Sequence, residues 1–563
     1  MFLKSKGMER ISGSTDGFPY SRPVIESKMR LSLRLVVALA ALSMLFQFCL
    51  STPLYQVRRF KKTSNEEQTQ NYWKRIADEE LNRAIRMKHN TNVAKNVILF
   101  LGDGMSIPTI TAGRIYKGQQ FSHSGEEGWL NFEQFPHVGL VKTYNVNKQV
   151  SDSASTATAY LGGVKTNYKT LGVDASAIYQ KCHTVTEDNK VYSIVKWAQD
   201  AGKKTGVVTS TRITHATPAG TYAHVADRDW ECDGNLPEGC DSIKDIARQL
   251  VEDEPGSLIN VLMGGGYQSL NSDAIGTEDD PLDDLYGCTR LDGRNLTEDW
   301  VNAKKNSGVK YAFVRNKTQL LTVDTNNVDY LLGIFANGHL QYEHEKRDKN
   351  LNVPTLANMT KAALEILGKG PEGYFLLVEG GRIDHAHHDT MAHRALDELV
   401  AMDDAIGVAM QMTDEKNTLI VVTADHAHTM SFSGYPQRGQ EIIGLAGLDE
   451  EGVGYTTLMY ANGPGYNNTR PNITAEDTRD WEYTQLATVP RDSETHGGDD
   501  VAIYARGPMA HLFHGLHEQN YIPFMMAYTS CIGDYKDHCH GGAEKAVPAL
   551  TLILLAISTW MLS

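Results

Sequence analysis

The stretch from Asn96 to Gly104, NVILFLGDG, decides the fold of this chain. A short apolar run that ends in Gly-Asp-Gly is typical of a strand buried in a parallel sheet. Similar runs recur at residues 205–210, 258–263, 374–378 and 418–423. Helical patterns lie between them, at residues 191–201, 243–252, 356–367 and 394–413. This alternation predicts an α/β fold with a largely parallel central sheet flanked by helices.

Side chains that can bind metal follow directly after these runs. They are Asp103 after the first, His215 and Thr217 after the second, Glu379, Asp384, His385, His387 and His388 after a later one, then Asp425, His426 and His428, with His496 further along. Because the carboxyl ends of parallel strands collect ligands, we expect these groups to converge. Converging carboxylates repel one another, so a cation is the natural compensation. Asp with His suits Zn²⁺, and carboxylates with a hydroxyl suit Mg²⁺.

A second informative stretch is QVSDSASTATAYLGG, residues 149–163, which predicts a turn followed by a helix of small residues. A serine at a helix N-terminus meets free backbone N–H groups and the positive end of the helix dipole, where a phosphate or an alkoxide is stabilised. The alternative is that Ser151, Asp152 and Ser153 only compete to cap the helix. Arg228, in HVADRDW, is the candidate for bidentate phosphate binding, with an exposed salt bridge as its alternative.

Composition limits the classes of function. The chain has 563 residues and a formal net charge of −15. This charge argues against general nucleic-acid binding, which needs a basic surface. It leaves anionic substrates open, because metal ions or an arginine can invert the field in one cleft.

Both ends are hydrophobic. Residues 35–50 follow Arg30 and Arg34 and predict a signal peptide over residues 1–51. Met29 is an alternative start of the chain. An uncleaved membrane anchor is the alternative to a cleaved signal. Residues 546–563 are apolar and uncharged after the small residues at 541–543. This pattern predicts a glycosylphosphatidylinositol (GPI) signal over residues 541–563, attached at Gly541 or as early as Asp537. A C-terminal membrane helix is the alternative.

The secretory route implies oxidised cysteines. Outside the signal these form an even set, namely Cys182, Cys232, Cys240, Cys288, Cys531 and Cys539. Glycosylation sequons, which are typical of surface loops in secreted proteins, occur at Asn295, Asn316, Asn358, Asn467 and Asn472.

Between its two hydrophobic ends, the chain divides into an arm, an inserted lobe and an α/β domain in two segments. Residues 66–90 have helical periodicity and predict an N-terminal helical arm. Residues 434–494, rich in Gly, Pro, Asn and Thr, predict a lobe inserted into the α/β domain. The α/β domain then comprises residues 91–433 and 495–540.

These motifs together resemble the alkaline phosphatase family. The matching segments are GDGM at 102, SDSASTATA around Ser153, THATPAGTYAH at 214, EGGRIDHAHH at 379, TADHAH at 423 and ETHGGDDVAIYARGP at 494. The resemblance runs from about residue 71 to residue 539. It is strongest to the animal, GPI-anchored, membrane-bound branch. Within that branch, the sequence is similar to the gut-membrane enzymes of insects.

The resemblance implies roles for individual residues. Ser153 is implied to be the nucleophile that becomes a phosphoserine, and Arg228 to hold the phosphate. One zinc ion is implied at Asp384, His388 and His496, a second at Asp103, Ser153, Asp425 and His426, and one magnesium ion at Asp103, Thr217 and Glu379. His215, His385 and His428 are implied to lie around these ligands and to orient them by hydrogen bonds. A purely structural role is the alternative for each. The implied reaction is hydrolysis of phosphate monoesters in two displacements, through the phosphoserine.

Further expectations follow from the same resemblance. It implies disulfides Cys182–Cys240 and Cys531–Cys539, and we predict that the remaining Cys232 and Cys288 pair with each other. It implies a homodimer in which residues 434–494 form a crown lobe and Tyr435 reaches the partner's active site. Mammalian relatives carry a calcium site, but Ala336 and Asn352 stand here in place of two acidic residues, so we do not expect calcium to bind in the same way.

Two other classes of function compete with this prediction. Phosphodiesterases and sulfatases share the sheet and the zinc pair, but no C/S-x-P-x-R motif surrounds Ser153. The chain could also be a catalytically silent, GPI-anchored receptor. Competent residues at every metal and nucleophile position argue against that alternative.

Overall fold

The structure, a computed structural model, describes residues 65–240 and 243–537. The predicted signal peptide, the C-terminal GPI signal with Gly541, and Cys539 lie outside the described residues. Within the described ranges, no helix has both the length and the apolar character needed to cross a membrane.

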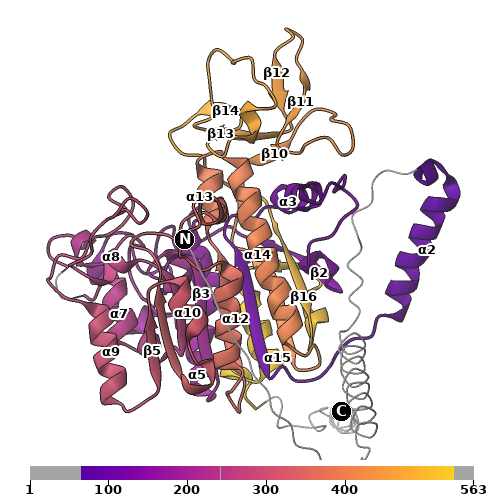
Figure 1. The fold of residues 1–563 in the computed structure, drawn as a ribbon. Helices are drawn as coiled ribbons and strands as arrows, with labels where there is room; N and C mark the ends of the chain where they lie inside the picture. The colour runs from indigo at the N-terminus through magenta and orange to yellow at the C-terminus, as the bar shows by residue number, and fades with distance from the viewer. Residues whose placement is uncertain (1–64, 241–242, 538–563) are drawn as a thin grey trace, which may run out of the picture. The chain divides into compact units, whose positions relative to one another are not determined.

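A ten-stranded sheet forms the centre of the molecule, in the order β17-β2-β16-β8-β1-β7-β3-β4-β6-β5 (Figure 1). Its strands are β1 (Asn96–Gly102), β2 (His137–Lys142), β3 (Lys204–Arg212), β4 (Val261–Gly265), β5 (Tyr311–Val314), β6 (Tyr330–Ile334), β7 (Tyr374–Gly380), β8 (Thr418–Ala424), β16 (Val501–Arg506) and β17 (Gly515–Glu518). The pairs β8–β1–β7–β3–β4–β6–β5 are parallel, and β16 runs antiparallel to both β8 and β2. The predicted α/β class with a largely parallel sheet is confirmed.

Helices lie on both faces of this sheet. They are α3 (Ile107–Gln120), α4 (Ser153–Gly162), α5 (Ile194–Asp200), α6 (Ala216–Ala219), α7 (Ile246–Glu252), α8 (Tyr267–Leu270), α9 (Leu296–Asn306), α10 (Lys317–Thr322), α11 (Glu343–Asp348), α12 (Leu356–Leu367), α13 (Arg382–His388), α14 (Ala392–Met412) and α15 (Tyr521–Ser530). Helices α12 and α14 contact each other and the central strands, and α4, α5 and α15 form a second contacting group (Figure 1). Strand β1 is buried along almost its whole length between these layers, which explains its unbroken apolar sequence.

Helix caps account for most differences between predicted and observed boundaries. Helix α5 begins at Ile194 because Ser193 accepts a hydrogen bond from the Val195 N–H, and α7 begins at Ile246 because Asp245 caps it. The run predicted at residues 258–263 becomes a strand only from Val261, because Gly256–Leu258 forms a 3₁₀ turn.

The inserted lobe and the arm stand apart from the main sheet. The lobe holds β11 (Leu445–Leu448), β12 (Gly454–Thr456), β13 (Leu458–Gly463) and β14 (Ala487–Pro490), beyond the ends of α13 and α14 (Figure 1). Its sheet begins slightly before residue 434, because β10 (Met430–Phe432) pairs with β13. Two short strands, β9 (Ala427–His428) and β15 (His496–Gly497), pair where the chain leaves and re-enters the main domain. The arm is α2 (Gln70–Arg86), which has no buried residue.

Two disulfides link the loops that follow α4, α6 and α8. Cys182 bonds to Cys240, and Cys232 bonds to Cys288, so both predicted pairings are confirmed. Cys531 is also disulfide-bonded. Disulfides of this kind are typical of extracellular and secretory proteins.

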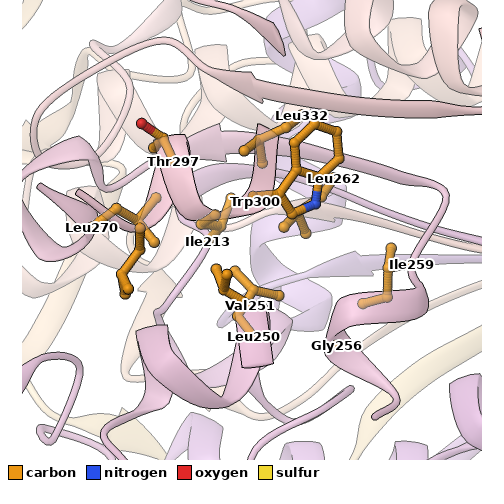
Figure 2. Close-up of a pocket in the computed structure, with 11 residues that line it drawn as sticks. Ile213, Leu250, Val251, Gly256, Ile259, Leu262, Leu270, Thr297, Trp300 and Leu332 are labelled. Carbon is orange, nitrogen blue, oxygen red and sulfur yellow. The ribbon is translucent and has the colours of Figure 1, made fainter. Parts of the chain in front are cut away.

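A small apolar gap lies between α7, α9 and the sheet (Figure 2). Its lining is almost entirely hydrocarbon, including Leu250, Leu262, Trp300 and Leu332, and it leaves about 10 Å³ of free space. A space of this size holds at most about one water molecule. The gap is therefore part of the core and not a ligand site.

A buried acidic pair joins α11 to α14. Glu343 and Glu398 are 8% and 4% exposed, and the Glu343 N–H donates to Glu398 Oε1 at 2.6 Å. Lys346 donates a hydrogen bond to Glu343 at 2.8 Å, so its positive charge lies against Glu343 and not against Glu398. Burial, and then the charge of Glu343, raise the pKa of Glu398 to about 8.

We expect Glu398→Gln to stabilise the protein increasingly as pH rises. A glutamate in an unfolded chain titrates near about 4.3, so above that pH the unfolded state loses its proton before the folded state does. Wild type therefore loses stability up to the folded pKa, by at most about 1.4 kcal/mol per pH unit, whereas the Gln variant has no such loss. Thermal denaturation of both proteins between about pH 6 and pH 8.5 measures the difference.

Glu365→Gln on α12 is the matched control, because Glu365 is 35% exposed and pairs with Lys361 at 3.5 Å. Its difference from wild type should not vary with pH over this range. Parallel melting-temperature curves for Glu398→Gln and wild type would show that Glu398 is ionised throughout.

Candidate active site

Strand register brings two aspartates together at the carboxyl edge of the sheet. Gly102 of β1 pairs with Ala424 of β8, so the next residues, Asp103 and Asp425, leave the sheet side by side. Both are fully buried. Burial first, and then the charges of Asp384, Asp425 and Glu379, raise the pKa of Asp103 well above its usual range. The protein alone does not compensate these charges.

Helix α4 places Ser153 beside this pair. Its N-cap is Asp152, whose carboxylate accepts hydrogen bonds from the N–H groups of Ala154 and Ser155. Because Asp152 does the capping, the Ser153 hydroxyl is left to face Asp103 Oδ1 at 3.4 Å and His426 Nε2 at 3.2 Å. Asp152 thus caps α4, and the Ser153 hydroxyl takes no part in the cap.

A cluster of imidazoles surrounds Asp384 of α13. His388 and His496 lie with their Nε2 atoms 3.1 Å apart, and each Nε2 is 3.4 Å from an Asp384 oxygen. Their Nδ1–H groups donate to the carbonyls of Glu494 and Ser151, so both Nε2 atoms carry lone pairs. Two facing lone pairs beside a carboxylate form a donor set that suits a zinc ion.

His428 belongs to the same cluster but is held differently. It lies between Glu494 Oε2 and Asp384 Oδ1, with each ring nitrogen bonded to a carboxylate at 2.5 and 2.6 Å. Burial lowers its pKa, but Glu494 and Asp384 outweigh burial and raise the pKa to about 10. His428 is therefore protonated and offers no lone pair, so it orients Asp384.

A third group of ligand atoms combines Glu379 with Asp103. The pKa of Glu379 is raised to about 7, mainly by burial, and its Oε2 accepts hydrogen bonds from the hydroxyls of Thr209 and Thr211. Glu379 Oε1 and Asp103 Oδ2 are buried without a hydrogen-bond partner. Thr217 on α6 is fully buried nearby and accepts a hydrogen bond from Tyr160. Unpaired carboxylate oxygens near a hydroxyl suit magnesium.

Arg228 approaches from the loop after α6. Its Nη1 donates to Asp152 at 3.3 Å, and its Nη2 donates to His215 Nε2 at 2.9 Å. Burial would lower the pKa of Arg228, but Asp152 and other carboxylates raise it overall, so the guanidinium stays charged at alkaline pH. The exposed salt bridge that sequence left open is excluded, because this side chain is only 14% exposed.

The structure also identifies residues that sequence reasoning missed or misplaced. Glu494 holds His428 with its side chain and His388 with its carbonyl, and Thr209 and Thr211 hold Glu379. Glu494 lies two residues before the candidate ligand His496 in the sequence, and this position is the signal that could have identified it. His387, a candidate ligand by sequence, is instead bonded to Thr109 and Tyr460.

Four groups of His, Asp and Glu could hold a metal ion in the described part of the chain. Three of them combine the residues above, and the fourth joins His215, His339 and His385. Asn352, one of the two positions where the resemblance expects an acidic residue, accepts hydrogen bonds from the backbone N–H and the hydroxyl of Thr318.

Comparison with known proteins agrees with this geometry. Residues 94–532 match the alkaline phosphatase family profile. The chain is 48% identical over 508 residues to the tissue-nonspecific alkaline phosphatase of Rattus norvegicus, covering 88% of this chain and 95% of that protein. It is 44% identical to alkaline phosphatase 4 of Drosophila melanogaster, covering 88% and 87% of the two chains. The solved alkaline phosphatase of the Antarctic bacterium TAB5 shares the fold, with a TM-score of 0.54 at 22% identity, over 79% of this chain and all of that one.

Metal removal should destabilise the protein, and more at alkaline pH. Carboxylates with raised pKa values, such as Asp103, stabilise the fold only while they are protonated, so without a cation their contribution is lost as pH rises. At a metal concentration about a thousand times Kd, each site is expected to add about 4 kcal/mol. Thermal denaturation with and without a chelator, at neutral and alkaline pH, measures this loss.

Asp103→Asn separates charge repulsion from a general loss of structure. We expect this variant to melt higher than wild type when both are stripped of metal at alkaline pH, and to bind less metal by elemental analysis. Asp200→Asn, a change at a 60% exposed position, should do neither. A stripped Asp103→Asn protein that melts below stripped wild type would contradict the repulsion argument.

Proposed function

Because this chain belongs to the alkaline phosphatase family, we propose that it hydrolyses phosphate monoesters through a phosphoserine on Ser153. The family is metal-dependent, and phosphate monoesters are its substrates. One observation carries the proposal for Ser153. Its hydroxyl lies between Asp103 and His426, at the point where the clusters of ligand-bearing side chains meet.

We propose two zinc ions and one magnesium ion per chain. Asp384, His388 and His496 would hold the first zinc ion, and Asp103, Asp425, His426 and Ser153 the second. Asp103, Thr217 and Glu379 would hold magnesium, and the unpaired oxygens of Asp103 and Glu379 support this assignment. When bound, the zinc pair supplies Lewis acidity that activates the attacking oxygen and stabilises the leaving one.

The chain itself prepares Ser153 for attack. The position of Ser153 in the first turn of α4 places its Oγ near the positive end of the helix dipole, which favours an alkoxide. Its Oγ lies 3.2 Å from His426 Nε2 and 3.4 Å from Asp103 Oδ1, so the residues that would hold the second zinc ion would bring that ion to the attacking oxygen. Attack on phosphorus expels the alcohol, and water then cleaves the phosphoserine and restores the serine.

Arg228 orients the phosphoryl group. Asp152 and His215 hold its guanidinium from two sides, and each Nη keeps a second N–H for a phosphate oxygen. A fixed, charged fork favours the dianion of a monoester over a diester, in which an ester group replaces one anionic oxygen. Little of the chain need contact the alcohol, so we expect broad specificity.

The same proposal extends to location. The disulfides indicate an extracellular or secretory protein, and we propose further that it is GPI-anchored at the cell surface. Asn467 and Asn472 are exposed on the lobe and are the favoured glycosylation sites among the five sequons. Asn358 is less suited, because its side chain takes part in the capping box of α12.

We propose a homodimer as the active form. Trp73, Leu81 and Ile85 on the arm helix α2 are 55%, 58% and 70% exposed, so this chain leaves an apolar helix face uncovered. Tyr435 in the lobe is fully exposed as well. A second copy of the chain would bury both features.

Ser153→Ala should reduce hydrolysis of p-nitrophenyl phosphate at alkaline pH by several orders of magnitude, because no other group is placed to form the covalent intermediate. A chelator should abolish wild-type activity. Mass spectrometry of protein quenched in acid during turnover should find one phosphoryl group on the peptide that contains Ser153, and none in the variant.

Ser151→Ala is the matched control. Ser151 is buried two residues away, and its hydroxyl has no hydrogen-bond partner, so this variant should keep both activity and the phosphopeptide. Metal-loaded wild type that cleaves diesters and not monoesters would favour a phosphodiesterase, and cleavage of neither would favour a silent receptor.

A further inference from the structure

Three histidines from distant parts of the chain meet where the arm joins the main domain. His89 lies between α2 and β1, His137 is the first residue of β2, and His511 lies in the 3₁₀ turn Ala510–Phe513. The rings of His89 and His511 are stacked, with their centroids 4.3 Å apart. His137 meets these two rings edge-on, at 5.7 and 6.1 Å. We call these three side chains the histidine stack, and none of them has a role in the mechanism above.

The histidine stack fastens a segment that we call the strap, residues 87–95, which runs from α2 to β1 (Figure 1). The other contacts of the strap are hydrogen bonds between neutral groups. The Asn90 side chain donates to the Glu415 carbonyl at 2.9 Å, and the Asn90 carbonyl accepts from the Met509 N–H at 2.7 Å. Helix α2 has no buried residue. The arm is therefore held at this end by a few neutral hydrogen bonds and by the histidine stack.

The histidine stack contains no group that could neutralise a protonated imidazole. His137 is 8% exposed, and the charged groups that face it among the described residues are His89, His511 and His514. His511 faces His89, and its Nδ1 is buried without a hydrogen-bond partner. A proton added to one ring therefore meets only groups that take the same charge.

The carboxylates on the surrounding elements are already paired with other side chains. Glu415 pairs with Arg506 of β16 at 2.9 Å, and Glu518 of β17 pairs with Lys142, at the far end of β2, at 3.0 Å. The other titratable groups that flank His89 or belong to β16, β17 and α15 are cations, one histidine and phenols, namely Arg86, Lys88, Tyr504, His517, Tyr521 and Tyr528. None of these groups favours a charged imidazole.

The direction of the pH effect follows from this environment. Burial first, and then the charges of the other histidines, lower the pKa of His137 to about 4, and burial lowers the pKa of His511. Once the strap has left, a histidine that faces water has a pKa of about 6.5. The released form therefore binds protons that the closed form does not bind. The closed form is fully favoured above about pH 6.5, and it loses about tenfold per pH unit for each such histidine as the pH falls.

We propose that His89, His137 and His511 form an acid-sensitive latch, which holds the arm against the main domain at neutral and alkaline pH and releases it in acid. Protonation places like charges on rings whose centroids are 4.3 Å apart, so the strap leaves while the sheet stays folded. The latch goes beyond the proposed function and does not depend on it. Because α2 carries the apolar face assigned to the dimer, release in an acidic compartment also weakens that contact.

Hydrogen–deuterium exchange of the full-length protein, with zinc and magnesium in excess, tests the latch between pH 8 and pH 5. The readout is the protection of the Met509 and Ala94 N–H groups, which donate to the carbonyls of Asn90 and Thr529. After correction for intrinsic exchange, this protection should fall about thirtyfold or more at pH 5, the factor given by a histidine pKa of about 4 in the closed form and about 6.5 in the released form.

Amides of β7 report unfolding of the whole domain and should keep their protection over the same range. Unchanged protection of the strap, or an equal loss in β7, would overturn the latch.

A double variant, His137→Phe with His511→Phe, keeps two aromatic rings in place and removes their titration. Its strap protection should change less than about threefold between the same pH values. His224→Gln is the matched control, because burial also lowers the pKa of His224 to about 4, but its ring lies against Tyr192 and not in the histidine stack. This control should show the full wild-type loss. Equal pH dependence in the double variant and wild type would contradict the latch.

A second measurement follows His137 in the wild-type protein, so it does not depend on how a variant folds. Exchange of the imidazole C2 hydrogen, measured by mass spectrometry as a function of pH, gives the titration midpoint of one histidine. The midpoint for His137 should lie at least about one pH unit below the ordinary value of about 6.5. A midpoint at the ordinary value would show that the closed strap does not keep this ring neutral, and the latch would be refuted.

Discussion

The convergence of buried carboxylates at one edge of the parallel sheet is the constraint on which the rest of the site depends. The register of β1 with β8 places Asp103 beside Asp425, and the register of β3 with β7 places Thr209 beside Glu379. These positions are fixed by backbone hydrogen bonds deep in the core, so side-chain rearrangement cannot separate the charges. Folding thus builds a site that is strained without cations and stable with them.

Histidines have three different roles around this edge of the sheet. The hydrogen-bond partner of each histidine determines its role. Carbonyl acceptors for Nδ1–H leave His388 and His496 with lone pairs directed at Asp384. Two carboxylates hold His428 in its charged form, where it supports Asp384 but cannot ligate. Arginine donors turn His215 and His385 into N–H donors. The histidines of this site are therefore not equivalent: some can bind a metal ion, one supports Asp384, and others donate hydrogen bonds.

Sequence patterns predicted the parallel sheet and the convergence of most of the candidate ligand residues at its carboxyl edge, because those residues directly follow apolar strands, whose ends meet at that edge. Asp103, Glu379 and Asp425 are of this kind. The return of the chain to the main sheet after the lobe was predicted and is confirmed by β16, but the antiparallel direction of β16 and the hydrogen bonds of Glu494 were not predicted, because both depend on tertiary contacts with β8, β2 and His428. The pairing of Arg228 with Asp152 crosses 76 residues and has no local signal.

The inserted lobe is attached to the catalytic domain through the same residues that hold the side chains of the Asp384 cluster in place. Glu494, at the end of the lobe, fixes His388 and His428, while His387 bonds to Tyr460 of β13 inside the lobe. Trp481 stacks between His344 and His393 and adds a third attachment at the base. A lobe anchored in this way cannot shift without moving the Asp384 cluster. The lobe's sequence can therefore vary at its exposed end, but its two junctions are constrained by their contacts with the Asp384 cluster.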